Sequence, residues 1–307
     1  MQHILSAGQF TTKQIEVIFK RADEMKDAFH NDRAKLAETH RGRLVATLFY
    51  EPSTRTRLSF EAAAQCQGMG VLSTENAGEF SSAVKGETIE DTIKVVSRYA
   101  DIVVIRHKEN GTAERAAAVS KVPIMNAGDG TGEHPTQSLL DLYTIFEAKG
   151  RLDNLHVVIG GDLKHGRTVR SLARMLSLYP GNSITFVSTP ELQADEALQT
   201  ELTKAGVAFT MTDDMLGAVS TADVVYWTRL QKERLTDPSL ESSYVIDEDA
   251  LNAMPKDAII MHPLPRVGEI AESVDADARA RYFEQAGNGL YVRAALLDLA
   301  LQDTAKG

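Results

Sequence analysis

The sequence has few of the residues that mark several classes of protein. Among its 307 residues there is one cysteine, Cys66, so no disulfide can form within the chain. This cysteine usage is typical of a reducing cytoplasm. No apolar run approaches the roughly 20 residues that span a bilayer. The opening "MQHILSAGQF" lacks the basic region and long apolar core of a signal peptide. The sequence therefore predicts a cytoplasmic protein with no membrane partner.

Signatures of nucleic-acid, nucleotide and metal binding are also missing. The formal net charge of -10 argues against a general binder of nucleic acid or membrane surfaces, because both are polyanionic. No G-x-x-x-x-G-K-[ST] segment occurs, and "GGDLKHG" does not fit the G-x-G-x-x-G dinucleotide pattern. No H-E-x-x-H or paired-cysteine set suggests a metal site. We expect no metal and no organic cofactor. In its helical setting "AAAQCQG", Cys66 is read as a small packed side chain rather than a nucleophile.

The apolar pattern predicts strands that alternate with helices through both halves of the chain. Expected strands lie at 43–50, 101–105, 122–126, 155–159, 183–187, 207–211, 222–227 and 258–261. Expected helices lie at 11–38, 55–67, 88–99, 112–119, 135–148, 167–178, 192–205 and about 289–302. Such alternation is typical of parallel sheets with helices on both faces. We predict an α/β fold with two doubly wound parallel-sheet domains.

The pattern also suggests domain boundaries. The first domain is expected to comprise residues 1–134 together with about 288–307, and the second about 150–287. A helix over 135–149 would link them. In open parallel sheets, ligands bind outside the carboxyl ends of the strands. Six polar clusters follow expected strands, which predicts a ligand crevice between the domains lined by Arg55, Arg106, His134, Arg167, Arg229 and His262.

The stretch "FYEPSTRTRLSFE", residues 49–61, places two arginines where a helix should not favour them. Ser53 and Thr54 are candidate helix N-caps, which puts Arg55 and Arg57 in the first turn. The positive end of the helix macrodipole favours acidic residues there. A bound anion would offset the repulsion, so residues 53–56 are interpreted as a phosphate site. The alternative is a structural cap with two solvated arginines.

Six motifs carry a family resemblance: "STRTR", "KGET", "GEHPTQSLLDL", "GDLKHGRTV", "TRLQKERL" and "MHPLPR". In order and spacing, across nearly the whole chain, they resemble the catalytic chains of the aspartate carbamoyltransferase family. The resemblance implies transfer of the carbamoyl group of carbamoyl phosphate to the α-amino group of L-aspartate. The products would be N-carbamoyl-L-aspartate and phosphate, at an early step of pyrimidine biosynthesis. It also implies a homotrimer with shared active sites.

The resemblance assigns a role to each matching residue. For carbamoyl phosphate it implies Ser53, Thr54, Arg55, Thr56, Arg106, His134, Gln137, the backbone carbonyls of Leu264 and Pro265, and Ser81 from a neighbouring subunit. For aspartate it implies Arg167, Arg229, Gln231 and a neighbour's Lys85. Arg55, Thr56, Arg106 and His134 would be catalytic, since fixed donors stabilise charge that develops on the carbonyl oxygen and departing phosphate. One departure is visible: relatives often carry two lysines before "GET", whereas Val84-Lys85 offers one.

Two alternative functions predict different features in the sequence. Ornithine carbamoyltransferases share the phosphate half but commonly carry "HCLP" and "SMG" segments, and here the sequence reads "HPLPR". A catalytically silent scaffold that binds partners predicts losses among the site residues, and none is seen. The sequence does not decide whether a separate regulatory chain binds, nor which group accepts the proton of the amine.

Overall fold

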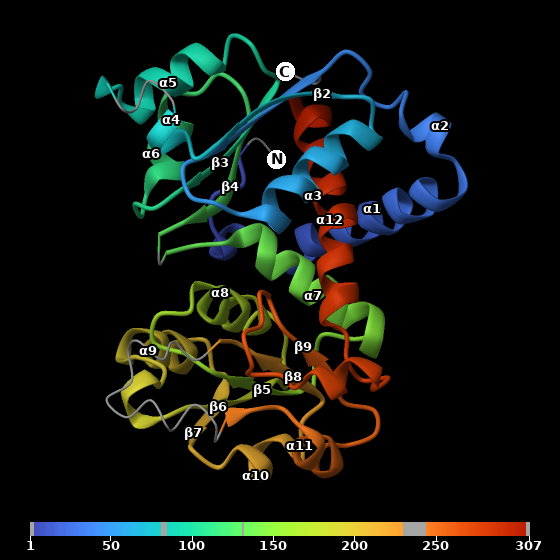
Figure 1. Cartoon of the computed structure of the whole chain (residues 1–307), viewed down its shortest axis with the longest axis vertical. Helices are drawn as coiled ribbons and strands as arrows, with labels where there is room; N and C mark the ends of the chain where they lie inside the picture. The colour runs from blue at the N-terminus through green and yellow to red at the C-terminus, as the bar shows by residue number, and fades with distance from the viewer. Residues whose placement is uncertain (1–2, 81–84, 131, 230–243, 305–307) are drawn as a thin grey trace. The chain divides into compact units, whose positions relative to one another are not determined.

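The computed structural model describes residues 3–80, 85–130, 132–229 and 244–304. The chain divides into two compact units, Met1–Leu139 with Gly287–Gly307, and Leu140–Ala286. Each unit contains one sheet whose strands are all parallel (Figure 1). The predicted α/β fold with two doubly wound parallel sheets is confirmed.

The first unit is built on a four-stranded sheet in the order β2-β1-β3-β4. Its strands are β1 (Leu44–Phe49), β2 (Gly70–Glu75), β3 (Ile102–His107) and β4 (Ile124–Asp129). Its helices are α1 (Thr12–Asn31), α2 (Arg33–Leu36), α3 (Thr54–Cys66), α4 (Ala77–Phe80), α5 (Ile89–Val96), α6 (Thr112–Val119) and most of α12 (Tyr282–Thr304). Helices α5 and α6 lie on one side of the sheet, and α1, α3 and α12 on the other (Figure 1).

Alternation along the strands explains how the first sheet is covered on both faces. Ala46 and Leu48 of β1 belong to a buried cluster with Ile93 of α5. Thr47, between them, donates a hydrogen bond to Glu61 of α3 at 3.0 Å on the opposite face. Successive side chains of a strand point to opposite faces, so one short apolar run supplies both layers.

Strand β2 and helix α4 were not predicted. Strand β2 is an edge strand that pairs only with β1, and its residues from Leu72 to Glu75 are exposed. Its sequence "GVLSTE" therefore has no apolar run to mark it. After this strand, Ala77–Phe80 form one helical turn. Two short helices of the second unit, Met215–Val219 and Glu248–Ala253, were not predicted either.

The second unit contains a five-stranded sheet in the order β7-β6-β5-β8-β9. Its strands are β5 (His156–Gly160), β6 (Ser183–Val187), β7 (Ala208–Thr212), β8 (Val224–Trp227) and β9 (Ile259–Met261). Its helices are α8 (Arg167–Leu176), α9 (Glu196–Lys204), α10 (Met215–Val219) and α11 (Glu248–Ala253), and α7 (Pro135–Lys149) enters it from the first unit. On one face, Val158, Val225 and Ile260 pack with residues of α10 and α11. Full burial of each such side chain contributes about 1.5–3 kcal/mol.

A close approach of β5 and β8 explains the glycines of "GGDLKHG". A Cβ atom on Gly160 would lie 2.1 Å from the ring of Trp227. Gly161 has a φ of +109°, and a Cβ there would lie 2.2 Å from the carbonyl oxygen of Thr228. Trp227 is fully buried and donates its indole N–H to the carbonyl oxygen of Tyr244 at 2.9 Å. The glycines are required by strand packing at this end of the sheet.

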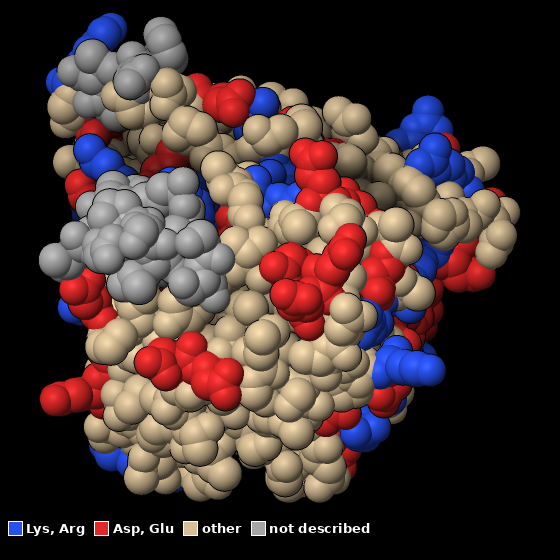
Figure 2. Space-filling model, turned by 60° about the horizontal axis from the view of Figure 1, so that its bottom comes forward, with Lys and Arg blue, Asp and Glu red and all other residues tan. Residues whose placement is uncertain are grey.

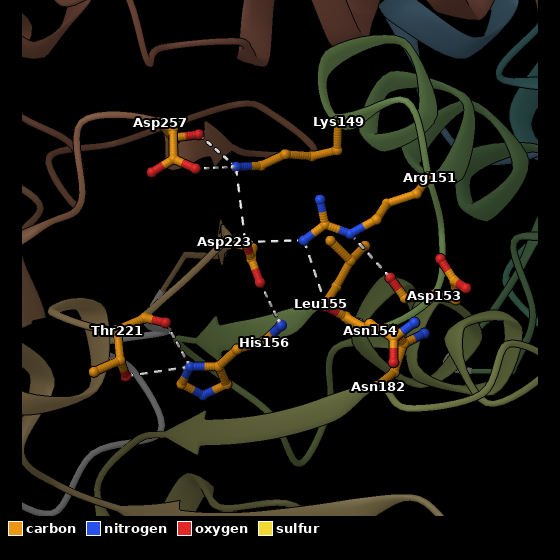
Figure 3. A network of polar contacts seen from close by, with 10 residues as sticks. All are labelled: Lys149, Arg151, Asp153, Asn154, Leu155, His156, Asn182, Thr221, Asp223 and Asp257. Carbon is orange, nitrogen blue, oxygen red and sulfur yellow. Dashed lines mark hydrogen bonds and ion pairs between the residues drawn. The ribbon is translucent and has the colours of Figure 1, made fainter.

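A polar network fastens the opposite, amino-terminal edge of the same sheet (Figure 3). Asp223 precedes β8, and its carboxylate accepts the backbone N–H of His156, the first residue of β5, at 2.8 Å. It also lies within 3.5 Å of Arg151 and 4.0 Å of Lys149. Lys149, at the end of α7, donates to the backbone carbonyl of Asp257. These charges are partnered and lie away from the carboxyl edge, so we read them as structural.

The surface carries charges of both signs. Figure 2 shows Asp and Glu in several separate groups on one face of the molecule, with groups of Lys and Arg between them. Among the described residues, no helix is long and apolar enough to cross a membrane.

Candidate functional site

The first unit brings its predicted site residues to one edge of its sheet. Residues 53–56 follow β1, Arg106 lies at the end of β3, and His134 follows β4. In the order β2-β1-β3-β4, the chain goes from β1 to β2 on one side and then returns to place β3 and β4 on the other side of β1. The direction of strand order therefore changes between β1 and β3. Ligands of doubly wound sheets bind at the carboxyl edge beside such a switch point. The carbamoyl-phosphate set of this unit therefore lies where the topology predicts a ligand.

The start of α3 is arranged to bind an anion. Ser53 occupies the N-cap position in an extended conformation, and its side chain makes no capping hydrogen bond. The first turn contains no acidic residue, whereas the first turns of α5, α9 and α11 do. Unsatisfied amides and the positive end of the macrodipole favour a phosphate at such a position. The buried hydroxyl of Thr56 lies in the same turn.

The two arginines of this turn have different environments. Arg57 donates to Glu75 at 2.7 Å and to Ser73 at 3.3 Å, both on β2, and lies 3.5 Å from Glu61. Protein carboxylates therefore offset its position in the first turn. Arg55 is exposed, and partial desolvation lowers its pKa from the ordinary value. An arginine nevertheless stays charged at any physiological pH, so Arg55 presents a permanent cation at the helix start.

Arg106 is oriented from two sides. It pairs with Phe49 of β1 across the sheet, and its side chain is 12% exposed. One terminal nitrogen donates to the carbonyl oxygen of Ala127 at 3.2 Å, and the other lies 3.4 Å from the carboxylate of Glu51. Glu51 was not among the predicted site residues, although it begins the polar cluster after β1. The carboxylate of Glu51 thus helps to orient the guanidinium of Arg106.

His134 follows a segment whose backbone is held by the carboxylate of Asp129. The carboxylate of Asp129, at the end of β4, accepts the backbone N–H groups of Gly111 and Glu133 at 2.9 and 2.8 Å. Gly130 has a φ of +46°, and a Cβ there would lie 2.1 Å from the side chain of Asn110. His134 is 4% exposed, and its carbonyl oxygen accepts the amide of Gln137 at 3.0 Å. Helix α7 then begins at Pro135, as expected for a proline at the first helical position.

The second unit repeats this arrangement with its own arginines. Strand order reverses between β5 and β8. Arg167, half-buried, is the first residue of α8 after β5, and its first turn contains no acidic residue. Arg229, exposed, follows β8 by two residues. Two cations beside a switch point suit a ligand with two anionic groups. Gln231 lies outside the described residues.

Leu264 and Pro265 follow β9, the neighbour of β8, at the same carboxyl edge. His262 precedes them and was expected to line the crevice. The structure contradicts this: its side chain is 2% exposed and its Nε2 lies 2.7 Å from Glu269 Oε1. The sequence alone does not show that the carboxylate of Glu269, seven residues later, pairs with this histidine in the interior.

Of the two residues expected from a neighbouring subunit, Ser81 lies outside the described residues. Lys85 is exposed and precedes Gly86, which has a φ of +87°. Helix α5 begins shortly after, with Thr88 as its N-cap. Lys85 is therefore placed on an accessible turn and not in the core.

Comparisons with known proteins identify the family of the chain. Residues 2–147 match the family model "Aspartate/ornithine carbamoyltransferase, carbamoyl-P binding domain", and residues 153–300 match "Aspartate/ornithine carbamoyltransferase, Asp/Orn binding domain". The chloroplastic aspartate carbamoyltransferase of Arabidopsis thaliana is 49% identical over 306 residues, covering 98% of this chain and 78% of the relative.

Solved structures give the same result. The catalytic subunit of M. Jannaschii aspartate transcarbamoylase superposes with a TM-score of 0.94 at 41% identity, covering 100% of both chains. The aspartate transcarbamoylase of Trypanosoma cruzi, in complex with carbamoyl phosphate and aspartate, has a TM-score of 0.90 at 36% identity, covering 97% of this chain and 94% of that one. The chain belongs to the aspartate/ornithine carbamoyltransferase family.

Proposed function

We propose that the protein is an aspartate carbamoyltransferase that transfers the carbamoyl group of carbamoyl phosphate to L-aspartate. The observation that carries the proposal is the pair of cationic helix starts, Arg55 on α3 and Arg167 on α8, each at the switch point of its sheet. Similarity to named aspartate carbamoyltransferases over nearly the full chain supports it. The product would serve pyrimidine synthesis.

Carbamoyl phosphate would be bound mainly by the first unit. The start of α3 supplies amides, the hydroxyls of residues 53, 54 and 56, and the guanidinium of Arg55 for the phosphate. Arg106 and His134 would donate to the carbonyl oxygen, with Gln137 and the carbonyls of Leu264 and Pro265 near the amino group. Arg167 and Arg229, with Gln231 and Lys85 in support, would bind the two carboxylates of aspartate.

The chemistry then requires placement and charge stabilisation. The neutral α-amino nitrogen attacks the carbonyl carbon and a C–N bond forms. The C–O bond to phosphate breaks, and its electron pair leaves with the phosphate. The nitrogen loses one proton, for which the departing phosphate is an acceptor in reach. Fixed donors such as Arg106 and His134 stabilise the developing oxyanion by roughly 3 kcal/mol each. Ordered binding of two substrates lowers the entropic part of the barrier.

An assay with two amine substrates tests the proposal. The protein is incubated with carbamoyl phosphate and either L-aspartate or L-ornithine, and the ureido product is identified by mass spectrometry. N-carbamoyl-aspartate is expected. Citrulline as the main product would identify an ornithine carbamoyltransferase, and no product with either amine would favour a silent scaffold.

A matched pair of arginines on α8 sharpens the assignment. Arg170, one turn after Arg167, donates to Asp195 and to the carbonyl oxygen of Lys164, so its charge is used within the unit. Arg167→Ala should raise the KM for aspartate by about 100-fold, because a substrate carboxylate loses its cation. Arg170→Ala should lower the melting temperature and leave that KM within a few-fold of the wild-type value.

We also propose that the active form is a cytoplasmic homotrimer in which Ser81 and Lys85 of one chain complete a neighbour's site. Lys85 is exposed on a turn, as a residue offered to another chain must be. Light scattering after size exclusion measures the oligomeric state, and repeating it with candidate regulatory chains tests for a larger assembly.

A further inference from the structure

The segment that follows β9 is held by a buried pair of side chains. His262 and Glu269, each 2% exposed, lie at its two ends, with Nε2 and Oε1 2.7 Å apart. The Nδ1 atom of His262 accepts the backbone N–H of Leu264 at 2.8 Å. The second oxygen of Glu269 accepts the backbone N–H of Val267 at 2.8 Å. Residues 262–269 are called the arch. Two backbone N–H groups within the arch, those of Leu264 and Val267, are therefore hydrogen-bonded to the side chains at its ends.

These contacts fix the tautomer of the imidazole. A backbone N–H can only donate, so Nδ1 is the acceptor and Nε2 carries the hydrogen that is donated to Glu269. Burial alone would raise the pKa of Glu269, but hydrogen bonds from His262 and Val267 lower it below the ordinary value. Glu269 is thus a permanent acceptor.

The arch is anchored to three other elements of the unit. The backbone N–H of His262 donates to the side chain of Gln285, in α12, at 2.9 Å. Gln285 donates to Asp141, in α7, at 2.7 Å, and Tyr226, in β8, donates to the second oxygen of Asp141 at 2.9 Å. Burial and the neighbouring Asp141 carboxylate raise the pKa of Tyr226 well above the ordinary value, so its hydroxyl remains a donor. The network cannot shift without leaving buried polar groups unpaired.

Leu264 needs such support. Its φ of +54° lies in the left-handed region, which branched side chains rarely adopt. Residues in this region persist where surrounding contacts over-determine them, and they cluster at functional sites. The hydrogen bond from the Leu264 N–H to Nδ1 of His262 holds this backbone, and the contacts of His262 with Glu269 and Gln285 hold His262 in turn.

We propose that His262 and Glu269 are positioning residues that fix the carbonyl oxygens of Leu264 and Pro265 as acceptors for the amino group of carbamoyl phosphate. This rests on the proposed function, which places those carbonyls at the substrate. On this proposal, the arch makes the enzyme prefer a carbamoyl donor to an acyl donor. Acetyl phosphate carries a methyl group where carbamoyl phosphate carries NH₂, so it cannot donate hydrogen bonds to the two carbonyl oxygens.

Two substitutions of one residue separate the contacts. In His262→Asn, the amide oxygen can take the place of Nδ1 and accept the N–H of Leu264, while the link to Glu269 is lost. In His262→Gln, the longer side chain can still donate to Glu269, but the N–H of Leu264 loses its acceptor. Both variants remove the imidazole, and each can keep one of its two contacts: His262→Asn the bond to Leu264, and His262→Gln the bond to Glu269.

The readout is the ratio of kcat/KM for carbamoyl phosphate to that for acetyl phosphate, with aspartate as the acceptor. His262→Gln should lower this ratio by about tenfold, the cost of one unmade buried hydrogen bond. His262→Asn should keep it within a few-fold of wild type. Inhibition by inorganic phosphate should be unchanged in both, because the arch does not bind the phosphate group. Equal loss with both donors in both variants would show general structural support and overturn the proposal.

A second measurement is independent of turnover. Hydrogen exchange at the Leu264 amide should become faster in His262→Gln and remain slow in His262→Asn. Unchanged exchange in His262→Gln would overturn the proposed role of His262 in the arch, whether or not the wild-type protein transfers a carbamoyl group. Absence of carbamoyl transfer by the wild-type protein would instead reject the proposed function. If His262→Gln does not fold, Glu269→Gln replaces it. The side-chain amide of that variant can donate to Nε2 of His262, which places the imidazole hydrogen on Nδ1 and removes the acceptor of the Leu264 N–H. Glu269→Gln should therefore lower the same ratio, and a normal ratio in the folded variant would count against the proposal.

Discussion

Replacing Arg55 and Arg57 one at a time by alanine separates a functional cation from a structural one within a single helical turn. Both side chains lie at the start of α3, where the macrodipole disfavours positive charge by about 0.3–1 kcal/mol. Arg57 has protein partners on β2 and α3, whereas the described structure gives Arg55 none through its guanidinium. The two substitutions should therefore change the free energy of unfolding in opposite directions.

The expected sizes follow from these contacts. Arg57 is 21% exposed and its partners Glu61 and Glu75 are 15% and 43% exposed, so each ion pair is worth up to about 1 kcal/mol. Relief of the dipole repulsion returns about 0.5 kcal/mol. Arg57→Ala should thus lower the free energy of unfolding by about 1 kcal/mol or slightly more. Arg55→Ala should leave it unchanged or raise it by about 0.5 kcal/mol.

Urea unfolding and the carbamoyl-transfer assay are run on both variants. Arg55→Ala should abolish turnover in a protein at least as stable as wild type, and Arg57→Ala should retain most turnover in a less stable one. The reasoning is refuted if Arg55→Ala loses several kcal/mol of stability while it keeps its activity. The same conclusion follows if inorganic phosphate protects wild type and Arg55→Ala equally against thermal unfolding.

Three further predictions address the aspartate half, the assembly and acid stability. Arg229→Ala should raise the KM for aspartate by about 100-fold and that for carbamoyl phosphate by only a few-fold; equal changes would place Arg229 in the wrong half of the site. Inactive homotrimers of Lys85→Ala and His134→Ala should regain activity when they exchange subunits, and hybrids that stay inactive would show that Lys85 does not serve a neighbour. Hydrogen bonds from Arg279 lower the pKa of Asp277 to about 2, so its stabilisation is present above pH 4 and is lost as the pH falls through 2. Asp277→Asn should therefore cost about 1 kcal/mol at pH 7, in urea unfolding, and progressively less below pH 4; a constant difference would reject the linkage.

The sheets could be predicted because most of their strands are buried on both sides. Runs such as "DIVVI" and "HVVI" have the length and the Val/Ile content of a buried central strand, and β3 and β5 are formed there. Strand β2 could not be predicted in this way. It lies at the edge of its sheet and exposes Ser73 and Thr74, so its position depends on pairing with β1 rather than on its own apolar content.

For the site, the sequence indicated which residues are unusual but not which of them meet protein partners. Arg55 and Arg57 are equally improbable at a helix start, and what separates them is the position of carboxylates brought close by the fold: Glu75, from β2, accepts a hydrogen bond from Arg57. In the same way, the sequence does not show that Glu269 pairs with His262. A cation that the fold has already paired is available for structure, and one that it has left at a helix start is available for a ligand. The distinction requires strand register and loop geometry, which is why positions near the switch points could be predicted and the division of roles among them could not.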